Sequence, residues 1–135
     1  MTRTAIAATL LTLVASFCLN AESIVLKANV PFEFRIGEVR MPAGVYLVFE
    51  DRGLVKIRTE RGTSSAIYLT TPAERKVRNA SGILEFNRFG NENFLTRMWK
   101  PDSTLGVVLP KSKRESELMS RSASPQVATV ALQRK

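Results

Sequence analysis

The chain has 135 residues, of which 20 are Lys or Arg and 12 are Asp or Glu, so its formal net charge at neutral pH is +8. It contains no histidine and a single cysteine. This composition excludes Ser-His-Asp and Cys-His catalysis, and it excludes zinc sites built from thiolate and imidazole ligands. The length is that of one domain, which must be stabilised by buried apolar surface because no internal disulfide can form.

The first 21 residues have the pattern of a secretory signal peptide. A start that carries Arg3 precedes an apolar run at 5–19 (AIAATLLTLVASFCL), and Ala21 offers a cleavage site. We therefore expect an exported, periplasmic or secreted protein that is not an integral membrane protein once processed. The alternative is a retained anchor, although a spanning helix needs about 20 apolar residues. Cleavage removes one basic residue and no acidic one, which leaves a net charge of +7.

Short strands separated by turns account for most of the remaining chain. Alternation of apolar and charged residues at 32–36 (FEFRI) indicates a strand with one buried face. Asp51-Arg52-Gly53 predicts a tight hairpin, in which the glycine can take positive φ. On the same criteria we expect strands at 24–36, 45–50, 54–58, 64–70, 82–89, 94–99 and 104–109.

Two segments lack a clear strand pattern. Residues 72–81 (PAERKVRNAS) are polar and are expected to form a loop, and residues 122–135 are expected to form a disordered basic tail. The domain itself is expected to span 22–121. Its short strands predict an all-β fold, either a single antiparallel β-sandwich or a small barrel, with a short C-terminal helix.

The helix is predicted at 112–121. Ser112 and Glu115 have the spacing of a capping box, in which the hydroxyl and the carboxylate each accept a hydrogen bond from the other residue's backbone. Leu118 and Met119 are its only apolar residues, and we expect them to anchor the helix on the domain.

The hairpin at 82–99 carries the first candidate binding site. If its strands pair symmetrically about a four-residue loop at 90–93, then Arg88, Arg97 and Trp99 share one face. Guanidinium groups bind anions and an indole stacks on a sugar ring, so this set predicts an anion- or sugar-binding patch. The alternative is that the arginine stems cover the sheet and Trp99 belongs to the core.

The second candidate site is a group of cations around the expected helix, which could bind phosphates or an acidic partner. Its members are Lys111, Lys113, Arg114 and Arg121. The alternative is a solvated helix face. No spacing brings two carboxylates together for catalysis, so the sequence predicts no catalytic residue, no metal site and no cofactor.

Several motifs, in their order along the chain, carry a resemblance to a known group of proteins. They lie at 30–37 (VPFEFRIG), 41–46 (MPAGVY), 86–90 (FNRFG), 94–99 (FLTRMW) and 109–115 (LPKSKRE). Together they resemble small exported β-rich proteins of unknown function from acidobacterial-type soil bacteria. Met41 replaces the leucine of that pattern and Phe89 its tyrosine, and both changes conserve packing. The resemblance implies export and a β-rich fold, and it implies no known activity.

From these observations we expect an exported, non-enzymatic β-domain with a macromolecular-interaction or envelope-associated structural role. The candidate partners are an envelope protein and an envelope polysaccharide. The alternative is a polyanion-binding protein that uses its basic surface to bind acidic polysaccharide, nucleic acid or anionic lipid.

Overall fold

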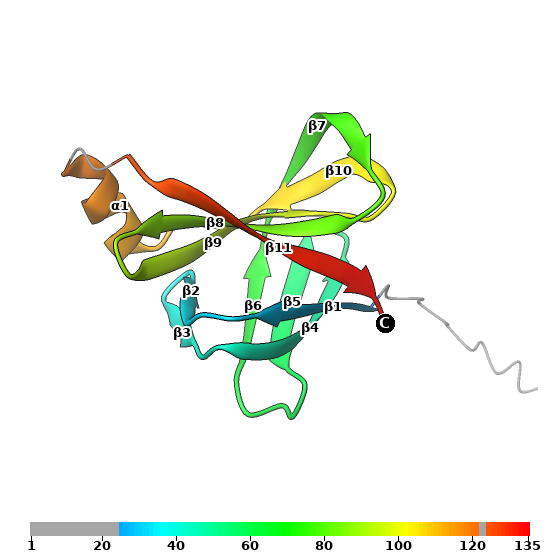
Figure 1. Cartoon of the computed structure of the whole chain (residues 1–135), viewed down its shortest axis with the longest axis horizontal. Coiled ribbons are helices and arrows are strands. Elements are labelled where there is room, and N and C mark those ends of the chain that lie inside the picture. Colours follow the sequence, from blue (N-terminus) through cyan, green and yellow to red (C-terminus); the bar gives the residue numbers. More distant parts are fainter. Residues whose placement is uncertain (1–24, 122–123) are drawn as a thin grey trace, which may run out of the picture.

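The structure is a computed structural model that describes residues 25–121 and 124–135. The expected signal peptide at 1–21 lies outside the described residues. Eleven strands and the helix α1 (Lys113–Ser120) make up the described chain (Figure 1). The strands are β1 (Val25–Val30), β2 (Phe34–Ile36), β3 (Val39–Met41), β4 (Gly44–Asp51), β5 (Leu54–Thr59), β6 (Ser65–Leu69), β7 (Thr71–Asn79), β8 (Gly82–Phe89), β9 (Glu92–Trp99), β10 (Ser103–Val108) and β11 (Gln126–Arg134).

The strands form one sheet that curls into a nearly closed barrel (Figure 1). The sheet order is β3-β2-β9-β8-β11-β1-β4-β5-β6, and only the β2–β9 contact is parallel. In addition, β10 pairs with both β7 and β9. Only Thr70 separates β6 from β7. The chain therefore passes directly from β6, at one end of the sheet order, to β7, which is joined through β10 to β9. The prediction of an all-β fold, sandwich or barrel, with a short C-terminal helix is confirmed.

The core lies inside the barrel, where every second residue of a strand points. Leu26, Val48 and Ile57 are paired across β1, β4 and β5, and all three are buried. Phe34 packs edge-on against Tyr46 and Phe86, with ring centroids 5.2 and 5.3 Å apart. Since successive side chains of a strand alternate between faces, the residues of β1, β4, β5 and β6 that alternate with core residues point outward.

The loop predicted at 72–81 is wrong for most of its length, because Thr71–Asn79 form β7. Within the described residues β7 pairs only with β10, and most of its side chains are exposed. A strand that buries so little needs no alternating apolar residues. Charged residues such as Glu74 and Lys76 suit an exposed edge, where they oppose pairing with other chains.

The disordered tail predicted at 122–135 is also wrong, because residues Gln126–Arg134 form β11 between β8 and β1. Leu132 is only 1% exposed, and Ala128 and Val130 pack against the core. The alternation in this segment is weak in sequence. It is sufficient because β11 has partner strands on both sides, which supply its backbone hydrogen bonds.

The predicted helix is present, and Ser112 caps it, since its Oγ accepts a hydrogen bond from the backbone N–H of Glu115 at 3.0 Å. The expected reciprocal bond from the Ser112 backbone to the Glu115 carboxylate is not found among the described residues. The expected apolar anchors contribute unequally, because Leu118 is half-buried while Met119 is 40% exposed. Glu115 is the buried residue of the helix, and its carboxylate accepts a hydrogen bond from Asn87 of β8 at 3.1 Å. A polar contact therefore holds α1 against the hairpin.

Candidate functional site

The β8–β9 hairpin does not have the register expected from the sequence. Its turn spans 90–91 rather than 90–93, and a bulge further along the ladder shifts the pairing again. The shorter turn shifts the pairing by two residues and keeps each side chain on its expected face. The bulge, between Glu85 and Phe86, shifts it by one, so Arg97 and Trp99 lie on the outer face of the barrel and Arg88 on the opposite face of the sheet. The expected arrangement of these three side chains as one patch is therefore wrong.

The polar edge of Trp99 is already engaged by neighbours. Its indole N–H donates to Glu85 Oε2 at 3.0 Å, and Glu85 Oε1 lies 3.5 Å from Arg97 Nη1 in an ion pair. The guanidinium of Arg75, from β7, lies over the indole, 5.3 Å from its centroid. These contacts occupy the groups that would bind a sugar or an anion, which favours a structural role for Trp99.

Arg88 is likewise engaged in contacts within the fold. Its guanidinium lies 5.1 Å from the centroid of Phe32, and its Nε donates to Asn93 Oδ1 at 2.7 Å. Asn93 is buried and donates in turn to the backbone carbonyl of Glu33 at 3.1 Å. Arg88 therefore ties the hairpin to the segment between β1 and β2.

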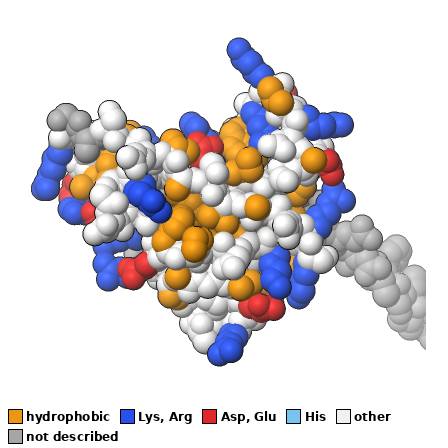
Figure 2. Space-filling model, viewed as in Figure 1, with side chains coloured by type: hydrophobic (Ala, Val, Ile, Leu, Met, Phe, Trp, Pro, Cys, Tyr) orange, Lys and Arg blue, Asp and Glu red, His pale blue; other side chains and the backbone are white. Residues whose placement is uncertain are grey.

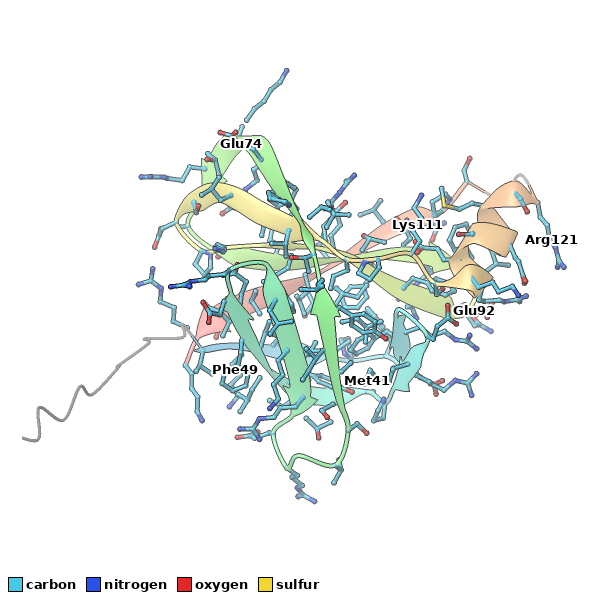
Figure 3. The ribbon with its side chains drawn as sticks, turned by 180° about the vertical axis from the view of Figure 1, so that it is seen from behind. Met41, Phe49, Glu74, Glu92, Lys111 and Arg121 are labelled. Carbon is cyan, nitrogen blue, oxygen red and sulfur yellow. The ribbon has the colours of Figure 1, made fainter. Side chains whose placement is uncertain are left out.

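The four cations expected to form a polyanion site are not gathered in one place. Nε and Nη2 of Arg114 donate to the two carboxylate oxygens of Glu92, each at 3.0 Å. Lys113 begins the helix, and Figure 3 shows Lys111 and Arg121 at its opposite ends. On the face seen in Figure 2, Lys and Arg side chains are scattered rather than concentrated. The alternative of a solvated helix face agrees better with this arrangement.

A different surface combines cations with exposed apolar side chains, on the outward side of β1, β4, β5 and β6. One row of directly paired residues runs Val25–Phe49–Lys56–Ile67 across these four strands. Two adjacent rows contain Arg58 beside Ser65, and Leu54 beside Leu69. Paired residues share a face of the sheet, so these rows form one continuous surface. We call its most exposed part the β5–β6 face, defined by Leu54, Lys56, Arg58, Ile67 and Leu69.

The apolar members of the β5–β6 face are strongly exposed. The exposed fractions are 42% for Leu54, 55% for Ile67 and 78% for Leu69. Each is paired with another member of the face, since Leu54 faces Leu69 and Ile67 faces Lys56. A single exposed aliphatic side chain on a protein surface needs no explanation, whereas a contiguous group marks an interaction site.

The cations of the β5–β6 face have no acidic partner among the described residues. Neither Lys56 nor Arg58 forms an ion pair with any residue in the described part of the chain. Arg58 lies over Phe49, which Figure 3 labels, at 5.5 Å from the ring centroid. Lys56, Arg58 and Phe49 also line a shallow surface hollow of about 440 Å³, together with Gly62 and Ser65. The face therefore presents positive charge and aliphatic side chains together.

The sequence contained a signal for this face that could have been used. In 54–58 (LVKIR), buried residues alternate with residues that point outward. The same alternation occurs in 65–69 (SAIYL). Placing the cations beside the exposed aliphatic residues required the register between β5 and β6. That register follows from the hairpin geometry and cannot be obtained from either strand alone.

Across residues 25–121 and 124–135, no three His, Cys, Asp or Glu side chains lie close enough together to hold a metal ion. The one helix of these residues has neither the length nor the hydropathy needed to span a membrane.

Comparison of the chain with protein-family models, with curated proteins and with solved structures finds no match. The resemblance to small exported β-rich proteins therefore stays a prediction.

Proposed function

We propose that this chain is an exported, non-enzymatic β-domain that attaches to anionic lipid at a membrane surface of the cell envelope. The β5–β6 face is the part that makes contact. The observation that carries the proposal is that exposed Ile67 lies opposite Lys56 across the β5–β6 ladder, next to the exposed Leu54–Leu69 pair. Lys56 forms no ion pair with a described residue. Aliphatic side chains can enter the headgroup region while the neighbouring cations meet lipid phosphates.

The chemistry of the β5–β6 face suits a lipid surface better than a protein partner. Energetically dominant residues of protein interfaces are enriched in Trp, Tyr and Arg, and leucine is under-represented among them. The strongly exposed large apolar residues of the described chain are all aliphatic or Met, and none is aromatic. Each Lys or Arg near an anionic leaflet contributes about 1 kcal/mol, and each inserted aliphatic side chain adds the free energy of burying its apolar area.

Co-sedimentation with vesicles of phosphatidylglycerol and phosphatidylcholine tests the proposal. The test variant combines Lys56→Glu with Ile67→Ser. The control combines Arg78→Glu with Val77→Ser on β7, where Val77 is 71% exposed and Arg78 is exposed without an ion pair to any described residue. Both variants change the net charge equally, so a general electrostatic effect cancels between them.

We expect the β5–β6 variant to bind phosphatidylglycerol vesicles at least about tenfold more weakly than the β7 control. The readout is this difference, because the apolar run at 5–19 could itself enter a bilayer in both variants. Equal binding of the two variants contradicts the proposal. So does a β5–β6 variant that loses retention on heparin while still binding vesicles, since the face would then bind soluble polyanions. If the β5–β6 variant binds vesicles normally but loses a cross-link to an acidic envelope protein, the face would instead bind a protein partner.

A further inference from the structure

A separate cleft lies between the β2–β3 hairpin and the β8–β9 turn. It has a volume of about 270 Å³, and its charged and amide lining comes from Glu33, Arg35, Arg40, Asn91, Glu92 and Asn93. Figure 3 labels Glu92, which lies near α1 and the β2–β3 hairpin. The cleft is smaller than the pockets that hold drug-sized ligands, which begin at about 300 Å³, so it suits a small ligand or one group of a larger ligand.

Two arginines face each other in this cleft. Arg35 of β2 and Arg40 of β3 are a directly paired cross-strand pair, and both line the cleft. Like charges placed opposite each other destabilise a hairpin. The pairing is therefore unfavourable for the hairpin alone, and its cost is reduced by any negative charge that lies between the two guanidinium groups.

The two carboxylates of the cleft are already engaged, one by Arg40 of the cleft itself and the other by Arg114 of α1. Glu33 Oε1 accepts from Arg40 Nε, with 3.0 Å between the two atoms. Glu92 is held by both Nε and Nη2 of Arg114, each at 3.0 Å. The pKa of Glu92 is lowered, chiefly by this hydrogen bond from Arg114 and further by the positive charges of Arg114, Arg35 and Arg40. Glu92 therefore stays ionised at neutral pH, and the charges of both Arg35 and Arg40 act on its carboxylate.

Hydrogen-bond donors exceed acceptors at this site. Arg35 forms no ion pair or hydrogen bond with any described side chain, so its five N–H groups are available, and Arg40 uses only Nε. The amide of Asn91 adds two further donors at the rim. Arg114 also forms an ion pair with Glu117, at 3.9 Å, so the excess at this site is one of hydrogen-bond donors rather than of net charge.

We propose that the cleft between Arg35 and Arg40 binds a phosphate group, either of a soluble phosphate monoester or of a lipid headgroup. A phosphate presents several acceptor oxygens in different directions and can bridge two guanidinium forks, whereas a planar carboxylate pairs best with one fork. The site is distinct from the β5–β6 face and does not depend on the function proposed for that face.

Titration of the ¹⁵N-labelled full chain with inorganic phosphate, followed by NMR, tests this proposal. We expect saturable shifts centred on Arg35, Arg40 and Asn91, with a Kd of the order of 1 mM for this minimal ligand. Acetate serves as the carboxylate control and is expected to bind at least about tenfold more weakly. Glycerol phosphate and vesicles that contain phosphatidic acid then distinguish the two sources of the phosphate group.

The decisive variant is Arg35→Gln, because it removes donors without breaking an ion pair. We expect it to weaken phosphate binding by about tenfold or more, whereas Arg78→Gln, at an exposed position of β7, leaves the affinity unchanged. An unchanged ¹H–¹⁵N spectrum away from the cleft shows that the variant is folded. The proposal is overturned if phosphate causes no saturable shift at the cleft, if Arg35→Gln binds as well as the unaltered chain, or if acetate binds equally.

Discussion

Trp99 lies directly against Gly106, its partner across the β9–β10 ladder. A Cβ atom at position 106 would overlap both the indole ring and the backbone carbonyl of Met98. The contact is steric, because Gly106 is not among the residues with positive φ in the described chain. Glycine at position 106 therefore leaves the space that the indole occupies while it donates to Glu85.

Gly106→Ala is therefore expected to destabilise the protein by about 3 kcal/mol, since the backbone of β9 must move to admit the methyl group. Urea unfolding followed by circular dichroism measures this change, and the fluorescence of Trp99, the sole tryptophan, reports on the local repacking. A variant of unaltered stability and unaltered fluorescence would show that the contact is looser than described.

Leu132 anchors β11 in the core, so Leu132→Ala is expected to cost about 3 kcal/mol of unfolding free energy. Val127 of the same strand is 60% exposed, and Val127→Ala provides the matched control, with an expected cost below about 1 kcal/mol. Urea unfolding of both variants makes the comparison. Similar small losses in both would indicate that the C-terminal residues are not part of the folded barrel.

Glu115 is expected to make stability depend on pH. Its burial raises the pKa of the carboxyl above the usual 4.5, an effect that is opposed by the hydrogen bond from Asn87 and the charge of Lys111. The folded state thus holds the proton more tightly than the unfolded chain. This contribution to stability is complete below pH 4.5 and is lost as the pH rises through the folded-state pKa.

Glu115→Gln, which keeps an acceptor for Asn87, is therefore expected to be more stable than the unaltered chain at neutral pH. The difference should disappear below pH 4.5, where the carboxyl is protonated in both states. Urea unfolding at the two pH values tests this expectation. A stability difference that does not change with pH would contradict the assignment.

Tyr46 is buried, its hydroxyl donates to the backbone carbonyl of Pro42, and burial raises its pKa from 10.0 to about 12. The neutral phenol is favoured in the folded state, so this contribution to stability is lost as the pH rises from 10 through about 12. An absorbance titration of tyrosinate should show a step near pH 12 that is absent from Tyr46→Phe. Removal of the hydrogen bond should cost about 1 kcal/mol at neutral pH. A titration without a step near pH 12 would place the hydroxyl in contact with solvent.

Segments with strong local patterns were predicted correctly from the sequence. The turn at Gly53 and the capping of α1 by Ser112 depend on residues that are close together in the chain. The elements that were missed are β3, β7 and β11. β3 has only three residues, and β7 and β11 have weak strand patterns of their own, so all three depend on partner strands for their hydrogen bonds. Pairing with distant strands cannot be predicted from the sequence of one segment alone.

The candidate sites were predicted less well because each depends on register. A one-residue bulge between Glu85 and Phe86 separated Arg88 from Trp99, and the pairing of β5 with β6 brought Lys56 beside Ile67. Shifting a strand by one residue moves every side chain to the other face. Local sequence therefore identifies the residue types that are available for binding, and the pairing of distant strands decides which of them meet.

The most direct test of lipid attachment places an environment-sensitive dye on the β5–β6 face. With Cys18 replaced by serine, Leu69→Cys carries the dye in one protein and Val77→Cys carries it in the other, both positions being strongly exposed. On addition of phosphatidylglycerol vesicles, we expect the emission of the dye at position 69 to shift to the blue while that at position 77 is unchanged. An unchanged emission at position 69, or an equal shift at both positions, would contradict attachment through the β5–β6 face.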